Sequence, residues 1–130
     1  DYILICAKII FMKILVVEDD PFLQKVLITK FKKEKFEVLG ARDGEEAVEK
    51  AKLKPDFILL DILLPQKSGF EVLAEYKKFL DPQKTQIIIL SNLGQKDDIQ
   101  KGIELGAVDY IVKAEMKIDD IVKKVMSLAV

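Results

Sequence analysis

Four short, nearly continuous apolar runs constrain the fold of this chain more than any other feature. They lie at residues 13–17, 57–60, 86–90 and 108–112. Runs of this length that lack polar alternation are typical of strands buried on both faces, as in a parallel sheet. Such a sheet needs helices on both sides, so the sequence predicts an α/β fold.

Helical signals separate these runs. Apolar residues recur at helical spacing after Asp20, which precedes a proline, and again after Asp43, and both aspartates are candidate N-caps. A shorter strand at residues 36–39 is expected to stop at Gly40, and a later helix to close at Gly106. Five strands alternating with five helices predict a flavodoxin-like, doubly wound (βα)5 three-layer sandwich, whose five-stranded parallel sheet has the order 2-1-3-4-5.

Composition bounds the classes of function. The 130 residues suffice for one domain, and 21 basic against 22 acidic residues give no electrostatic case for binding nucleic acid or a membrane. Cys6 is the only cysteine, so no internal disulfide can form and a cytoplasmic location is expected. The chain has no histidine, which excludes Ser-His-Asp and Cys-His catalysis and leaves only oxygen ligands for a metal.

Residues 1–11 stand apart from this pattern. Their apolar run is interrupted by Lys8, and Lys13 follows, so it is too short for a transmembrane helix and has no signal-peptide cleavage site. We expect an N-terminal extension at 1–11 and the domain proper at 12–130. An extra strand or an interaction segment is the alternative.

The residues that follow the strands are chemically useful. In the predicted order, the carboxyl ends of four adjacent strands carry Glu18 with Asp19, Asp61, Ser91 and Lys113, and they share one crevice. Close carboxylates raise one another's pKa unless a cation lies among them. With no histidine and no thiolate cluster, the cation that suits them is Mg²⁺, which prefers carboxylates and phosphate oxygens.

This cluster can support phosphoryl transfer. A carboxylate such as Asp61 beside Mg²⁺ can attack phosphorus and form an aspartyl phosphate. Lys113 can pair with phosphoryl oxygens, and Ser91 can donate a hydrogen bond to one of them. The structural alternatives are that Lys113 only neutralises Asp61, that Ser91 only begins a loop, and that the acids after the first strand favour a helix start. We assign that last role to Asp20.

Motifs at these strand ends resemble one known family. The segments are 14–20 (ILVVEDD), 41–47 (ARDGEEA), 59–65 (LLDILLP) with Gly69 following, 88–91 (IILS) and 106–113 (GAVDYIVK). Over about residues 12–128, the chain resembles the receiver domain of two-component response regulators. The resemblance implies a phosphorylation switch that is not an enzyme beyond its own phosphorylation and dephosphorylation. It is expected to be a stand-alone receiver or one excised from a longer protein.

The resemblance also implies roles for the acidic residues. Asp61 resembles the phosphoacceptor, which takes a phosphoryl group from the phosphohistidine of a sensor histidine kinase or a phosphotransfer protein. Asp19 resembles the direct Mg²⁺ ligand and Glu18 the ligand that acts through water. Asp61 and the backbone carbonyl of Leu63 would complete the protein ligands.

The remaining roles concern the response. Ser91 resembles the switch hydroxyl, Lys113 the phosphate-binding lysine, and Tyr110 the aromatic residue that turns inward on activation. The implied output is the surface formed by the helix, strand and helix within residues 97–126. It would contact an unidentified downstream protein or a second copy of the chain, with no direct nucleic-acid or membrane binding.

The chain departs from the family pattern at three positions. Ala114 follows the lysine where the family usually has proline, Asn92 stands where a small residue is usual, and Leu63 stands where a polar side chain is common. The alternative function is a Mg²⁺-dependent phosphatase of the haloacid dehalogenase type. Leu63 disfavours it, because that family has an acid/base aspartate two residues after the nucleophile.

Overall fold

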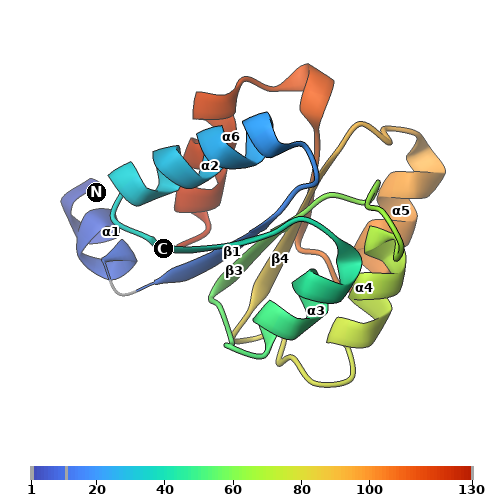
Figure 1. Cartoon of the computed structure of the whole chain (residues 1–130). Coiled ribbons are helices and arrows are strands. Elements are labelled where there is room, and N and C mark those ends of the chain that lie inside the picture. Colours follow the sequence, from blue (N-terminus) through green and yellow to red (C-terminus); the bar gives the residue numbers. More distant parts are fainter. Residues whose placement is uncertain (1, 11, 130) are drawn as a thin grey trace.

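The computed structural model describes residues 2–10 and 12–129, and its centre is a five-stranded parallel sheet (Figure 1). The strands are β1 (Lys13–Val17), β2 (Glu37–Ala41), β3 (Phe57–Leu60), β4 (Gln86–Ser91) and β5 (Asp109–Val112). Every neighbouring pair is parallel and the order is β2-β1-β3-β4-β5. The predicted fold class and strand order are confirmed.

Helices cover both faces of the sheet. They are α1 (Tyr2–Ile9), α2 (Pro21–Lys33), α3 (Gly44–Ala51), α4 (Gly69–Tyr76), α5 (Lys96–Glu104) and α6 (Ile118–Ser127), with a 3-10 turn, η1 (Lys113–Glu115), after β5. Figure 1 shows α2 and α6 on one face and α3, α4 and α5 on the other. The sheet is therefore the middle of three layers.

Successive residues of a strand enter different cores. Ile14 and Val16 belong to the core beneath α2 and α6, whereas Leu15 and Val17 belong to the core beneath α3 and α4. All four side chains are buried. Because side chains of a strand point alternately to opposite faces, a strand covered on both sides must be apolar at every position. This arrangement explains the runs without polar alternation.

Both predicted N-caps form. The Asp20 carboxylate accepts hydrogen bonds from the amides of Phe22 (2.9 Å) and Leu23 (3.3 Å), and the Asp43 carboxylate accepts one from the amide of Glu46 (2.8 Å). These bonds satisfy amides that a helix start leaves without a partner. Asp20 is therefore a capping residue, as predicted.

The predicted end of the second strand is wrong. Gly40 pairs with Val16 and Ala41 with Val17, so β2 continues to Ala41 instead of stopping at Gly40. The Ala41 carbonyl then accepts the Glu18 amide at 3.0 Å. Pairing with β1 outweighs the local tendency of glycine to end a strand. The backbone groups of β1 are buried, so they need hydrogen-bond partners, and β2 supplies them.

The N-terminal segment is helical where the structure describes it. Ile9 of α1 is fully buried, and Ile5 packs against the same core. The alternative of an extra strand is therefore wrong for residues 2–9. Asp1, Phe11 and Val130 lie outside the described residues. Among the described helices, none is long and apolar enough to cross a membrane.

We predict that a chain beginning at Met12 keeps the fold with reduced stability. It loses the burial of Ile9, which contributes about 1.5–3 kcal/mol, while every strand remains. Thermal and urea unfolding would measure this loss. Ile9→Ala in the full chain is the matched variant and should lower the free energy of unfolding by a similar amount. An unfolded truncated chain would show that α1 belongs to the domain.

Candidate functional site

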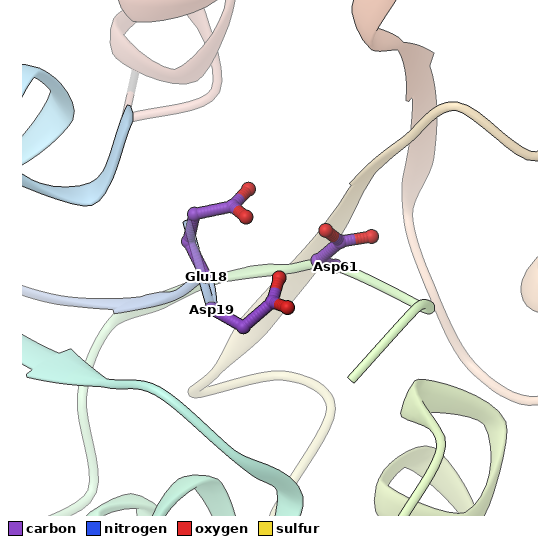
Figure 2. Close-up of side chains that lie close together, drawn as sticks. All are labelled: Glu18, Asp19 and Asp61. Carbon is purple, nitrogen blue, oxygen red and sulfur yellow. The ribbon is translucent and has the colours of Figure 1, made fainter. Parts of the chain in front are cut away.

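Three carboxylates meet at the carboxyl ends of two neighbouring strands. Glu18 and Asp19 follow β1, and Asp61 follows β3. Figure 2 shows the three side chains turned toward one another, and one ligand oxygen from each lies within 4.8 Å of the others. Glu18 is 2% exposed and Asp61 4% exposed, whereas Asp19 is open to solvent. Parallel pairing of β1 with β3 brings these distant residues together, as the sequence predicted.

Lys113 joins the cluster from the end of β5. Its ammonium lies 2.6 Å from the Glu18 carboxylate and 2.7 Å from the Asp61 carboxylate. The sequence anticipated the pairing with Asp61 but not the equal contact with Glu18. That second contact depends on where the buried Glu18 side chain lies relative to the end of β5, which a motif does not record.

Burial and charge shift the pKa values of this group. Burial raises the pKa of Glu18, and its hydrogen bonds with Lys113 and the Asp20 amide only partly oppose the rise. Burial lowers the pKa of Lys113, but its hydrogen bonds with Asp61 and Glu18 raise it more, so the net shift is upward. Lys113 therefore carries its positive charge at neutral pH and compensates one of the carboxylates.

The backbone holds Asp61 firmly. Its amide donates to the Val17 carbonyl at 3.1 Å, and its carboxylate accepts the Leu63 amide at 3.1 Å. The first residue of α4, Gly69, packs so closely that a Cβ there would lie 2.5 Å from the Asp61 carbonyl oxygen. Gly69 is thus required for α4 to begin beside the site. It belongs to the quoted motif, but its contact could not be read from the motif.

Ser91 and Tyr110 are linked through one residue. Ser91, the last residue of β4, is fully buried, and its hydroxyl accepts the Leu93 amide at 3.4 Å. The Tyr110 hydroxyl donates to the Leu93 carbonyl, so its side chain already points inward. Burial raises the pKa of Tyr110, and the charges of Asp98 and Asp61 add to the rise. The loop after β4 is therefore tied to both predicted switch residues.

The donor set suits a hard divalent cation. With all three carboxylates ionised, Lys113 leaves two negative charges uncompensated. Carboxylate oxygens are the ligands that Mg²⁺ prefers, so the group fits the ion. Leu63 lies two residues beyond Asp61 and is 54% exposed. Because its side chain is a hydrocarbon, only its backbone carbonyl could serve as a ligand.

A short 3-10 turn connects the end of β5 to α6. Residues 113–115 form η1 and α6 begins at Ile118. In the part of the chain that the structure describes, no peptide bond is cis, including the one before Ala114. With alanine in place of the usual proline, the Lys113 ammonium still lies 2.7 Å from the Asp61 carboxylate.

Comparison with known proteins defines the class. A family model described as the response regulator receiver domain matches residues 14–126. The chain therefore belongs to the receiver domains of two-component response regulators. This membership decides against the haloacid dehalogenase alternative, in agreement with Leu63 standing where that family has an aspartate.

Curated relatives differ in length. The chain is 40% identical over 103 residues to the chemotaxis protein CheY of Thermotoga maritima, which covers 78% of this chain and 84% of that protein. It is 38% identical over 104 residues to the alkaline phosphatase synthesis transcriptional regulatory protein PhoP of Bacillus subtilis, covering 78% of this chain and 42% of PhoP. It likewise spans 41% of the probable transcriptional regulator ycf27 of Cyanophora paradoxa.

Solved structures agree with this membership. A complex of CheX, CheY, BeF3 and Mg²⁺ from Borrelia burgdorferi contains a chain with a TM-score of 0.81 and 32% identity, covering 92% of this chain and 90% of that one. The Francisella response regulator 1452 receiver domain has a TM-score of 0.79 and 30% identity, with 91% and 96% covered.

We predict that Lys113→Ala destabilises the metal-free protein by about 3 kcal/mol, because Glu18 and Asp61 then stay buried without a counter-charge. Added Mg²⁺ should stabilise this variant more than the parent, since a cation that binds only the folded state acts by mass action. Urea unfolding with and without Mg²⁺ measures both effects.

The matched control is Lys30→Ala. Lys30 forms an exposed ion pair with Asp119 at 2.6 Å, and loss of such a pair costs less than about 1 kcal/mol. Its response to Mg²⁺ should equal that of the parent. Equal stability of Lys113→Ala and the parent without metal would contradict the assigned role.

Proposed function

We propose that this receiver domain accepts a phosphoryl group on Asp61 from the phosphohistidine of a sensor histidine kinase or phosphotransfer protein. The observation that carries the proposal is the position of Asp61, which is buried among two further carboxylates and contacts an ammonium at 2.7 Å. Glu18 shares this setting, and the motif at residues 59–65, which resembles the phosphoacceptor motif of the family, favours Asp61 as the nucleophile. A cytoplasmic location is proposed with it, since the lone cysteine cannot form an internal disulfide.

The reaction requires a carboxylate that acts as a nucleophile. An oxygen of Asp61 would attack phosphorus while the bond between phosphorus and the donor imidazole breaks, and the imidazole leaves. Mg²⁺, held by Glu18, Asp19, Asp61 and the Leu63 carbonyl, would supply neutralising charge for the phosphoryl oxygens. An ionised carboxylate has no proton to lose when it attacks phosphorus, so the domain needs no general base for this step.

Lys113 would change partners during this step. In the structure its ammonium compensates Glu18 and Asp61. A phosphoryl group on Asp61 adds strong acceptor oxygens and negative charge. Lys113 would then pair with these oxygens, and the Ser91 hydroxyl would donate to another.

We predict Mg²⁺-dependent incorporation of one phosphoryl group from acetyl phosphate, measured by intact-protein mass spectrometry. Asp61→Asn should incorporate none, and Asp19→Ala should lose the Mg²⁺ dependence together with most of the incorporation. Asp20→Asn is the matched control, because asparagine also caps the helix, and it should react like the parent. Incorporation that persists in Asp61→Asn would disprove the assignment.

The response would pass through Leu93. Its amide is bonded to Ser91 and its carbonyl to Tyr110. If Ser91 turns to a phosphoryl oxygen, its bond to Leu93 is lost and the loop shifts together with Tyr110. Because Tyr110 is already inward, the switch would move an existing linkage and would not begin with an inward rotation. Such a change is a shift between two packings of different affinity for the phosphoryl group.

The output surface would be the one formed by α5, β5 and α6. Tyr110 and the chain to Lys113 lie in or next to β5, and the loop that holds Leu93 leads into α5. The downstream partner would be a protein of unidentified sequence or a second copy of this chain. Nearly balanced charge supports neither direct nucleic-acid binding nor membrane binding.

We predict that beryllofluoride, an acyl-phosphate mimic, shifts amide NMR signals beyond the site. Leu93, Tyr110 and exposed positions of α5 such as Gln100 should move, because the Ser91 bond to the loop changes. Residues of α1, which precedes β1 at the end opposite the site, serve as the internal reference for shifts unrelated to the site. Shifts confined to residues 61–63, with 91–113 silent, would argue against this output surface.

A further inference from the structure

Gly44, the first residue of α3, provides space for a neighbouring loop. It is buried, and its φ is not in the left-handed region, so the backbone there does not require glycine. Alanine would favour a helix more than glycine does. A Cβ at this position, however, would lie 2.5 Å from the Lys67 Cβ and 2.6 Å from the Lys67 carbonyl oxygen.

Lys67 belongs to the segment that links Asp61 to α4. This segment, residues 62–68, is internally bonded: the Lys67 amide donates to the Pro65 carbonyl at 2.8 Å, and the Leu64 amide donates to the Ile62 carbonyl at 3.1 Å. At its far end, the Gly69 amide also donates to Ile62, at 2.8 Å. A displacement at Lys67 therefore moves the segment as a unit.

The segment is tied to the phosphoacceptor at its beginning. Leu63 donates its amide to the Asp61 carboxylate, so its position and that of the carboxylate are coupled. A shift of residues 62–68 thus changes both Asp61 and the Leu63 carbonyl. These are two of the proposed metal ligands.

Helix α3 cannot retreat to relieve a clash at Gly44. Its start is capped by Asp43, and Ala47 and Ala51 are fully buried against the sheet core. The Ala47 carbonyl also accepts the buried Tyr76 hydroxyl of α4 at 2.8 Å. With α3 held on both sides, the segment 62–68 is the part that must move, since Leu63, Pro65 and Gln66 within it are exposed.

We infer that Gly44 is a positioning residue for the metal site, because the first turn of α3 is the surface that holds segment 62–68 in place. The three heavy atoms nearest to a Cβ at Gly44 all belong to Lys67, so Gly44 acts through that residue. The inference rests on the proposed function. It adds a residue far from Asp61 in the sequence to those that set Mg²⁺ affinity.

Calorimetric titration of the full chain with Mg²⁺ tests this role without a phosphodonor. We expect Gly44→Ala to weaken Mg²⁺ binding by roughly tenfold, the lower end of what loss of groups that orient metal ligands costs. Gly40→Ala is the matched control. The atoms nearest to a Cβ at Gly40 would belong to the side chains of Ile28 (3.0 Å) and Gln24 (3.2 Å) and not to segment 62–68, so Mg²⁺ affinity should not change.

Two results would overturn the inference. One is parental Mg²⁺ affinity in a Gly44→Ala protein whose circular dichroism shows the native fold, and the other is an equal loss in Gly40→Ala. If Gly44→Ala does not fold, Lys67→Gly and Lys67→Ala decide. Both lose the ion pair with Glu75, but only Lys67→Ala keeps a Cβ against Gly44. Weaker Mg²⁺ binding by Lys67→Gly than by Lys67→Ala supports the inference, and equal binding by the two variants refutes it.

The proposed function is tested separately from Gly44. Phosphoryl incorporation at Asp61 of the parent protein reports on the function, whereas the difference in Mg²⁺ affinity reports on Gly44. Mg²⁺ binding that Gly44→Ala weakens, with no incorporation in the parent, would refute the function and support the inference. Incorporation in the parent with unchanged affinity in Gly44→Ala would refute only the inference.

Discussion

The contact of one ammonium with two buried carboxylates is the interaction on which the site depends. Glu18 and Asp61 are almost fully removed from water, and a buried charge without a partner is costly. Lys113 compensates them at 2.6 and 2.7 Å. A buried ion pair contributes little net stability compared with apolar residues in the same place. The contact of Lys113 with the two carboxylates therefore indicates a functional role and not a stabilising one. The same three groups are the ones that a phosphoryl group and a cation would engage.

Parallel pairing makes this contact possible. Residues 18, 61 and 113 lie far apart in the sequence, and each follows the end of a strand. In a parallel sheet these ends share one edge, whereas hairpin connections would send neighbouring ends to opposite edges. The cost of closing long crossover connections is offset by two apolar cores, one on each face. The same topology therefore buries the apolar side chains in two cores and brings the reactive side chains together at one edge of the sheet.

Close backbone packing then sets the precision of the site. Gly69 lets α4 begin against Asp61, and Gly44 lets the intervening segment rest against α3. On the other side, Leu93 connects Ser91 to Tyr110. The segments that follow the neighbouring strands β3 and β4 thus have different proposed roles. The segment after β3 carries proposed metal ligands, and the loop after β4 carries the proposed response.

The sequence alone determined the fold class, the strand order and the residues at the strand ends, because these depend on periodicity and on strand direction. It also identified Asp20 and Asp43 as helix caps, which are local. Only the tertiary structure decided the continuation of β2 to Ala41, the helical form of residues 2–9 and the inward position of Tyr110. Each of these depends on contacts between segments that are distant in the sequence: pairing with β1, burial of Ile9 in the core, and a hydrogen bond to Leu93. Local propensity cannot report such contacts, because their energy exists only when both segments are in place.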